Sequence, residues 1–202
     1  DHYGGNGGHN LDESRGELGY ALFHYAMISN LRPKRVLCIG SAKGFIPAIC
    51  ALACKDNNQG HVDFVDAGYD ETNPNNWGGI GYWKSVDPQK HFSYLTLSSW
   101  ITTHVTTSED FARRCCEQWQ YIYIDADHSY VGVKRDYRLF WSRLKKGGFM
   151  TFHDVLLRHH TDPKYNHFGV WRFWKELVSH GKITLPFTYS SVLPSGLGIL
   201  QK

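Results

Sequence analysis

Acidic residues and histidines gather at two points of the sequence, each directly after a short apolar run. Asp125, Asp127 and His128 follow one such run, and His153 and Asp154 follow another. Carboxylates can bind a divalent cation that lowers the pKa of a bound hydroxyl, whereas an imidazole can accept a proton near neutral pH. These residue types therefore predict either metal-assisted or histidine-based proton transfer.

A glycine-bearing loop, Gly40-Ser41-Ala42-Lys43-Gly44, follows a third apolar run. Glycine lets the backbone approach a ligand, and the helix that follows points N–H groups at it. Asp66 ends the next run, where its carboxylate can accept both hydroxyls of a ribose. Ala42 and Phe45 stand where a dinucleotide fingerprint has glycine, and no Walker motif is present. The pattern favours S-adenosylmethionine, with a plain turn and a surface aspartate as the alternative.

The elements that must position these residues alternate along the chain. Strands are predicted over residues 35–39, 61–65, 101–105, 121–124, 149–152, 183–189 and 198–201, and helices over about 11–30, 45–55, 91–97, 108–116, 131–144 and 169–180. This alternation predicts an α/β fold with a doubly wound parallel sheet, in which ligands bind beyond the carboxyl ends of the strands.

Several local expectations accompany this assignment. Residues 1–10 contain four glycines and are expected to form a flexible arm, and residues 11–202 a single domain. Leu18, Leu22, Tyr25 and Ile28 recur at helical spacing and predict the apolar face of the first helix. Ser108 is a candidate N-cap, and residues 145–148, Lys-Lys-Gly-Gly, are expected to close the helix over 131–144.

Three segments resemble known proteins. Residues 36–44 are similar to the first motif of class I S-adenosylmethionine-dependent methyltransferases. Residues 124–130 (Ile-Asp-Ala-Asp-His-Ser-Tyr) and 145–154 resemble the small methyltransferase domains related to macrocin O-methyltransferase and the cephalosporin-hydroxylase-like proteins. The resemblance covers about residues 11–200. It implies a Rossmann-like seven-stranded sheet, mostly parallel with its last strand antiparallel, and helices on both faces.

The resemblance also implies site residues. Cofactor contacts are implied at Gly40, Ser41, Gly44 and Asp66, and we add Asp125, which ends the run over residues 121–124. Many relatives carry an acidic residue near the glycines where this chain has Cys38.

The predicted chemistry uses the two acidic and histidine-bearing segments. Asp125, His153 and Asp154 are the candidate metal ligands, and the nitrogen ligand would favour a transition metal over magnesium or calcium. We expect His128, His153 and Asp154 to be catalytic. In a metal-free alternative, His128 or His153 is the general base. Asp127 equally fits a simple helix cap.

Aromatic segments and further histidines carry weaker signals. Trp77, Tyr82 and Trp83 could form a lid over the acceptor or could pack against the sheet edge. Residues 168–174 have the helical spacing of core packing, in which Arg172 could be exposed towards the substrate. The histidines among residues 159–167 are expected to be loop residues rather than a zinc site, because the spacing is irregular and no cysteine lies near them. They are His159, His160 and His167.

Composition limits the partners. The chain has 22 Lys plus Arg against 19 Asp plus Glu, a net charge of +3, without the basic stripe of nucleic-acid binding proteins. No apolar run approaches the roughly 20 residues of a membrane span. Five cysteines without a C-x-x-C pair, two of them in an apolar helical pattern, indicate a reducing, cytoplasmic compartment. A small-molecule or sugar acceptor is expected, with no nucleic-acid or membrane partner, and a homo-oligomer stays open.

The sequence thus predicts an S-adenosylmethionine-dependent O-methyltransferase that acts on a hydroxyl of a small molecule or sugar, with metal assistance left open. Two other functions remain as alternatives. One is a non-catalytic S-adenosylmethionine-binding module of a larger protein. The other is an NAD-dependent oxidoreductase, which the residues of the glycine loop disfavour.

Overall fold

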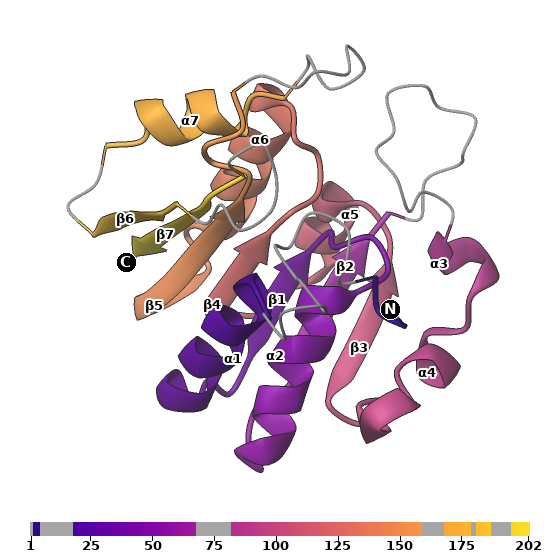
Figure 1. Cartoon of the computed structure of the whole chain (residues 1–202). Coiled ribbons are helices and arrows are strands. Elements are labelled where there is room, and N and C mark those ends of the chain that lie inside the picture. The colour runs from indigo at the N-terminus through magenta and orange to yellow at the C-terminus, as the bar shows by residue number, and fades with distance from the viewer. Residues whose placement is uncertain (1, 5–17, 68–81, 159–167, 179–180, 187–194) are drawn as a thin grey trace.

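A computed structural model describes residues 2–4, 18–67, 82–158, 168–178, 181–186 and 195–202 (Figure 1). The strands are β1 (Val36–Ile39), β2 (Val62–Asp66), β3 (Ile101–Val105), β4 (Trp119–Ile124), β5 (Leu144–His153), β6 (Lys182–Leu185) and β7 (Leu197–Gln201). The helices are α1 (Tyr20–Leu31), α2 (Phe45–Asp56), α3 (Tyr82–Ser85), α4 (Pro88–His91), α5 (Ser108–Arg114), α6 (Tyr130–Phe140) and α7 (Val170–Glu176), with a 3-10 turn η2 (Tyr94–Thr96).

The strands form one seven-stranded sheet in the order β3-β2-β1-β4-β5-β7-β6. Strands β1 to β5 pair in parallel, and β7 runs antiparallel to both β5 and β6. The predicted sheet, mostly parallel with an antiparallel last strand, is confirmed. The strand order reverses between β1 and β4, so the ends of these two strands mark the topological switch point where such sheets bind ligands.

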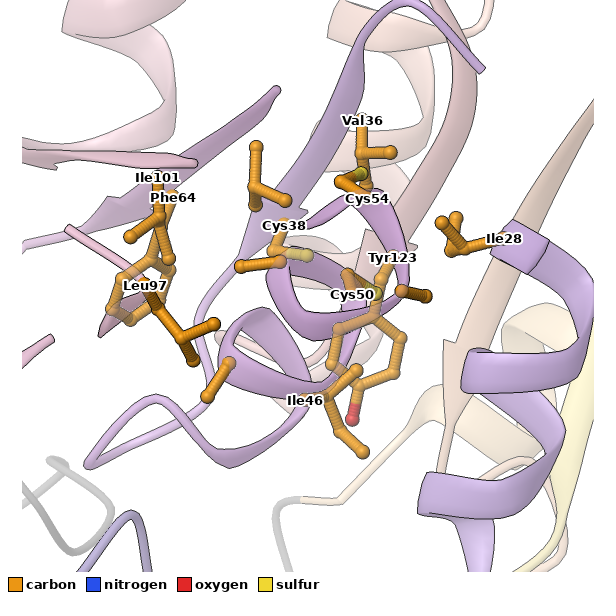
Figure 2. Close-up of a cluster of buried hydrophobic side chains, with 14 of the residues drawn as sticks. Ile28, Val36, Cys38, Ile46, Cys50, Cys54, Phe64, Leu97, Ile101 and Tyr123 are labelled. Carbon is orange, nitrogen blue, oxygen red and sulfur yellow. The ribbon is translucent and has the colours of Figure 1, made fainter. Parts of the chain in front are cut away.

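Helices cover both faces of the sheet, as predicted (Figure 1). Along β1, which is buried on both faces, Val36 and Cys38 belong to a core cluster with residues of α1 and α2. Leu37 and Ile39 belong to a second cluster with residues of α5, α6 and α7. Figure 2 shows the first cluster around Cys38, whose side chain lies among those of α2. The alternation along β1 thus supplies both halves of the core.

Only part of the face predicted for the first helix is buried: Ile28 is buried and Tyr25 half-buried, as predicted, whereas Leu18 and Leu22 are exposed. Leu18 is 53% exposed and Leu22 60%, whereas Tyr20, His24 and Ile28 are buried. His24 Nδ1 lies 2.6 Å from the hydroxyl of Tyr121 on β4. A polar contact with the sheet therefore helps to decide which face of α1 is buried, and a pattern of apolar residues does not reveal such a contact.

Several element boundaries differ from expectation. The helix predicted over 91–97 is instead α4 (Pro88–His91) followed by the η2 turn, and α7 ends at Glu176 with Leu177 as its C-cap. Helix α6 ends at Phe140, and residues 145–148 lie inside β5 instead of closing the helix, since the Trp141–Arg143 turn already reverses the chain. The N-cap of α5 is Thr107, whose side chain accepts a hydrogen bond from the Asp110 N–H, so Ser108 is the first helical residue. In the part of the chain that is described, no helix has the length and apolarity needed to cross a membrane.

A buried carboxylate ties together the amino ends of the strands. Asp63 of β2 accepts hydrogen bonds from Arg35 Nη2 and Trp119 Nε1, each at 2.8 Å, and lies 3.2 Å from His104 Nε2. Burial alone would raise the pKa of Asp63, but these partners outweigh it and lower the pKa below its usual range. We call Asp63, Arg35, His104 and Trp119 the amino-edge cluster.

Candidate active site

The opposite edge of the sheet brings the ends of β1, β4 and β5 together. Gly40 directly follows β1 with a φ of 72°, and a Cβ built there would lie 2.3 Å from the carbonyl oxygen of Asp125. Only glycine permits that approach. The cofactor loop predicted after β1 and the acidic segment after β4 are therefore in direct contact.

Four ionisable side chains converge at this edge: Asp125 and His128 after β4, and His153 and Asp154 at the end of β5. His128 Nε2 lies 3.3 Å from Asp125 Oδ1 and 3.2 Å from Asp154 Oδ2. His153 Nδ1 lies 3.3 Å from Asp125 Oδ1 and 3.2 Å from Asp154 Oδ1. Each imidazole thus touches both carboxylates. We call this group the carboxyl-edge cluster.

The turns that carry these residues are held by main-chain contacts. His128 Nδ1 lies 2.9 Å from the carbonyl oxygen of Ala126, and its ring stacks on Phe168 with centroids 4.7 Å apart. The Nδ1–H therefore donates to that carbonyl, and Nε2 is directed at the carboxylates. Asp154 adopts a φ of 60°, a conformation that non-glycine residues rarely occupy outside constrained sites. The N–H groups of Val155 and Leu156, the two residues after Asp154, donate hydrogen bonds to the carbonyl oxygens of Gly196 and Ser195.

Tyr123, which belongs to none of the sequence motifs, orients Asp125. The buried hydroxyl of Tyr123 donates to Asp125 Oδ2 at 2.8 Å, which leaves Oδ1 to face the two imidazoles. Tyr123 lies two residues before Asp125, and side chains two apart on a strand share a face. This two-residue spacing is the feature of the sequence from which the role of Tyr123 could have been predicted. The ring of Tyr20 lies edge-on to His153, with centroids 5.5 Å apart.

The cluster balances its own charge. Burial opposes the charged imidazole of His128, but hydrogen bonds and charge from Asp125 and Asp154 raise its pKa to about 10. Burial likewise opposes charge on His153, and the same two carboxylates raise its pKa to about 9. Burial would raise the pKa of Asp154, whereas the two imidazoles lower it. Two carboxylates and two imidazolium ions sum to zero, so the four groups can share a buried position.

The donor set also fits a divalent cation. Ligand atoms of Asp125, His128 and His153 all lie within 4.8 Å of one another, and Asp154 contacts both histidines. Two imidazole nitrogens together with carboxylate oxygens suit a transition metal better than magnesium or calcium, which prefer oxygen. The structure thus brings the predicted metal ligands Asp125, His153 and Asp154 together, with His128 in contact with both carboxylates of this set.

The cofactor loop keeps the features expected of a ligand site. Ser41 and Ala42 have φ values of 152° and 47°, and α2, 12 residues long, begins at Phe45 with Gly44 as its N-cap. Asp66 is the last residue of β2, the strand next to β1, and is half-buried. A strained loop, a helix N-terminus and a carboxylate one strand away fit an adenosyl ligand.

Cys38, which stands where relatives carry an acid, is not part of this loop. Its side chain is completely buried in the core, where burial raises the pKa of the thiol and Cys50 provides a hydrogen bond (Figure 2). Cys54 is buried in the same cluster, as the helical pattern predicts.

The other residues considered as site candidates have structural roles or lie outside the residues that the structure describes. Asp127 Oδ1 accepts a hydrogen bond from the Ser129 N–H in the turn before α6, but the N-cap of that helix is Ser129, whose hydroxyl accepts from the Gly132 N–H, so Asp127 is not the cap. Val170, Phe173 and Trp174 are buried, and Arg172 is exposed and paired with Glu176, as expected for core packing of this segment. Trp77, His159, His160 and His167 lie outside the described residues.

Tyr82 and Trp83 pack against the sheet and the cofactor loop. The Trp83 ring lies edge-on to Phe64 of β2 and stacks on Phe92, and the side chain is almost completely buried. The packing interpretation therefore holds for Trp83. Of the predicted arm, residues 2–4 are described, and Tyr3 stacks on Phe92.

Comparison with known proteins agrees with the fold. Residues 37–155, more than half of the chain, match a protein family described as a methyltransferase domain. The chain is also 24% identical over 193 residues to the uncharacterized protein y4gI of Sinorhizobium fredii. This match covers 95% of the chain but 20% of y4gI, so the chain spans about a fifth of the length of that relative.

Solved methyltransferases share the architecture. The O-methyltransferase TomG from Streptomyces achromogenes, in complex with S-adenosylmethionine, aligns with a TM-score of 0.68 at 12% identity, over 92% of this chain and 81% of TomG. An O-methyltransferase from Bacillus cereus, in complex with S-adenosylhomocysteine, gives 0.64 at 14% identity, over 96% and 83%. The methyltransferase PaMTH1 of Podospora anserina gives 0.66 at 14% identity, over 95% and 82%. At these identities the likeness shows the fold.

Proposed function

The chain belongs to the family of class I methyltransferase domains, and from this premise we propose that it transfers a methyl group from S-adenosylmethionine to a hydroxyl of a small molecule or sugar. The observation that carries the proposal is the carboxyl-edge cluster. It places two carboxylates and two imidazoles at the ends of β4 and β5, in contact with the end of β1. This position suits both the alignment of an acceptor and the removal of its proton.

The methyl donor would lie along the loop after β1. Gly40, Ser41 and Gly44 would contact its amino-acid part, and Asp66 would accept hydrogen bonds from the ribose hydroxyls. Asp125 would close the site from the side of β4, because Gly40 brings its backbone against the loop.

Asp125, His153 and Asp154 would hold a divalent cation, and that cation would lower the pKa of the acceptor hydroxyl. The Tyr123 hydroxyl fixes one oxygen of Asp125 and presents the other to the site. The imidazole of His153 makes the donor set richer in nitrogen than a set of carboxylates, which favours a transition metal.

His128 is the candidate proton acceptor. Transfer would join the hydroxyl oxygen to the methyl carbon while the donor sulfur leaves with the electron pair, and His128 Nε2 would take the hydroxyl proton. In the metal-free cluster His128 already carries a proton, because Asp125 and Asp154 raise its pKa to about 10. It can accept another group's proton only when these carboxylates are engaged elsewhere, as they would be in the loaded site.

A screen for methyl transfer tests the proposal. Purified protein is incubated with S-adenosylmethionine labelled in its methyl group and with panels of sugars, phenols and macrolides, with Co²⁺, Mn²⁺ or Mg²⁺ added separately. We expect label in a hydroxyl-bearing acceptor, loss of that transfer in Asp154→Ala, and little change in Asp127→Asn, a matched change in the neighbouring loop. Donor binding that Asp154→Ala leaves unchanged, with no labelled acceptor in any panel, would instead identify a non-catalytic binding module.

Chelation separates the two mechanisms. If a cation takes part, excess EDTA abolishes transfer and a transition metal restores it. Full turnover in excess EDTA would rule out the cation. His128 or His153 could then be the base only where the bound acceptor draws Asp125 and Asp154 away from that imidazole.

A further inference from the structure

Two side chains from the segment after β2 hold the cofactor loop by its carbonyl oxygens. The indole Nε1–H of Trp83 donates to the Ala42 carbonyl at 2.8 Å. His91 Nε2 lies 3.0 Å from the Lys43 carbonyl oxygen, so this nitrogen carries the hydrogen and donates. Trp83 is 3% exposed and His91 is 6% exposed, so both hydrogen bonds are shielded from water.

The backbone at these carbonyls is strained. Ala42 has a φ of 47° and Ser41 a φ of 152°, both in regions that side chains other than glycine rarely occupy. Such conformations cost free energy and persist only where the surroundings impose them. The hydrogen bond from Trp83 reaches the carbonyl of Ala42 itself, so it acts directly on a strained residue.

These hydrogen bonds also orient the loop N–H groups. In a trans peptide the N–H points opposite to the C=O of the same plane. Because Trp83 fixes the Ala42 carbonyl, the N–H of Lys43 points away from Trp83. Because His91 fixes the Lys43 carbonyl, the N–H of Gly44 points away from His91, and it donates to the Ser41 carbonyl at 2.7 Å.

Both donors are themselves fixed by aromatic neighbours. Trp83 stacks on Phe92 with centroids 5.6 Å apart and an interplanar angle of 12°. The Tyr82 hydroxyl lies 3.1 Å from His91 Nδ1, and by donating there it keeps the hydrogen of His91 on Nε2. The ring of His2 stacks on the ring of His91, with centroids 4.6 Å apart. Burial lowers the pKa of His91, which keeps the imidazole neutral.

We propose that Trp83 and His91 are positioning residues for binding of the methyl donor, because they hold the loop after β1 in the strained conformation that the donor requires. This inference rests on the proposed function, since it takes the loop to be the donor site. The inference gives Trp83 a role in binding the methyl donor, whereas the sequence suggests a lid over the acceptor or packing against the sheet edge.

A matched pair of tryptophan variants tests it. Trp83→Phe and Trp119→Phe each remove a buried indole hydrogen bond of 2.8 Å, one to the cofactor loop and one to Asp63 in the amino-edge cluster. Calorimetric titration with S-adenosylhomocysteine, well below the melting temperature of each variant, should show about tenfold weaker binding for Trp83→Phe. Trp119→Phe should stay within about twofold of the wild type, because distant sites act independently.

Histidine variants provide a test that does not depend on the folding of Trp83→Phe. Glutamine can place an amide N–H near the position of His91 Nε2, whereas leucine cannot donate. His91→Leu should therefore weaken binding roughly tenfold, and His91→Gln should recover most of that loss.

The outcomes separate this inference from the proposed function. If the wild-type protein gives no binding heat, the proposed function fails. If the wild type binds but Trp83→Phe and Trp119→Phe change affinity equally, or His91→Gln binds as weakly as His91→Leu, the positioning role is wrong.

Discussion

The two edges of the sheet each bury a charged cluster, but the partners of the carboxylates differ. In the amino-edge cluster, Asp63 accepts from a guanidinium and an indole and also lies 3.2 Å from the imidazole of His104. In the carboxyl-edge cluster, Asp125 and Asp154 face imidazoles alone among the cations that contact them in the described part of the chain. Arginine and tryptophan keep their hydrogens at all ordinary pH values, whereas an imidazole can release a proton or bind a metal.

This difference separates a structural cluster from a chemical one. Besides His104, Asp63 has two permanent donors, Arg35 and Trp119, and through them it holds the amino ends of β1, β2 and β4 together. The carboxyl-edge cluster stays neutral by sharing protons that a cation can displace. Both clusters contain buried charges, so burial of charge does not by itself identify a functional site. The two clusters differ in whether the partners of the carboxylates can exchange a proton for a cation.

The largest expected effect is on stability, at the amino edge. Asp63→Ala leaves the fully buried indole N–H of Trp119 without its acceptor and removes the carboxylate partner of Arg35. The unpaired buried indole and the lost hydrogen bonds to Asp63 should lower the free energy of unfolding by about 3 kcal/mol, measured by urea denaturation. Affinity for S-adenosylhomocysteine should not change in the folded fraction. A loss of stability below about 1 kcal/mol would show that the cluster is not structural.

The next effect is on cation binding, at the carboxyl edge. Asp154→Ala removes a carboxylate that contacts both histidines, and we expect affinity for Co²⁺, followed by its visible absorption, to fall roughly 100-fold or more. The free energy of unfolding should fall less than in Asp63→Ala, because His128 and His153 can release protons when a carboxylate is lost. Unchanged Co²⁺ affinity, with Asp127→Asn as the control, would show that Asp154 is not a ligand.

Asp136, a buried carboxylate outside both clusters, extends the comparison through pH. Asp136 of α6 accepts from the Ser108 hydroxyl at 2.6 Å, and burial raises its pKa from 3.8 to about 6. A raised carboxyl pKa favours the folded state below the unfolded pKa, and that advantage is lost as the pH rises through the folded pKa. Relative to Asp136→Asn, the wild type should therefore lose about 2 kcal/mol between about pH 4 and pH 7. A pH-independent difference between the two proteins would exclude ionisation of Asp136.

The smallest effect distinguishes two tyrosines on one strand. Tyr123 and Tyr121 are both buried on β4, but only the Tyr123 hydroxyl donates to Asp125. Tyr123→Phe should weaken Co²⁺ binding about tenfold, as expected for loss of a group that orients a ligand. Tyr121→Phe should leave Co²⁺ affinity near that of the wild type. Equal affinities for the two variants would mean that the hydroxyl of Tyr123 does not orient Asp125.

The fold and the predicted site residues follow from features that a sequence records. Strands of a parallel sheet appear as short apolar runs, and their carboxyl ends meet at one edge. Asp125, His128, His153 and Asp154 could therefore be expected to lie together before any contact was known. The antiparallel last strand came from the resemblance, because residue patterns alone do not give strand direction.

The contacts that the sequence did not predict depend on packing between distant segments. Leu22 looks like a core residue, yet α1 turns His24 toward Tyr121 and leaves Leu22 exposed. The indole of Trp83 donates to a carbonyl 41 residues earlier in the chain, and no local pattern encodes that pairing. The role of Tyr123 was within reach, since its parity with Asp125 on β4 places both on one face.

The central claim is that the carboxyl edge binds the methyl donor with Asp66 on its ribose, and a calorimetric titration with S-adenosylhomocysteine tests it most directly. The wild-type protein should give saturable heat for one site per chain, and Asp66→Ala, folded at the same temperature, should bind at least about tenfold more weakly. A flat titration of the wild type, or the same affinity in both proteins, would contradict the claim.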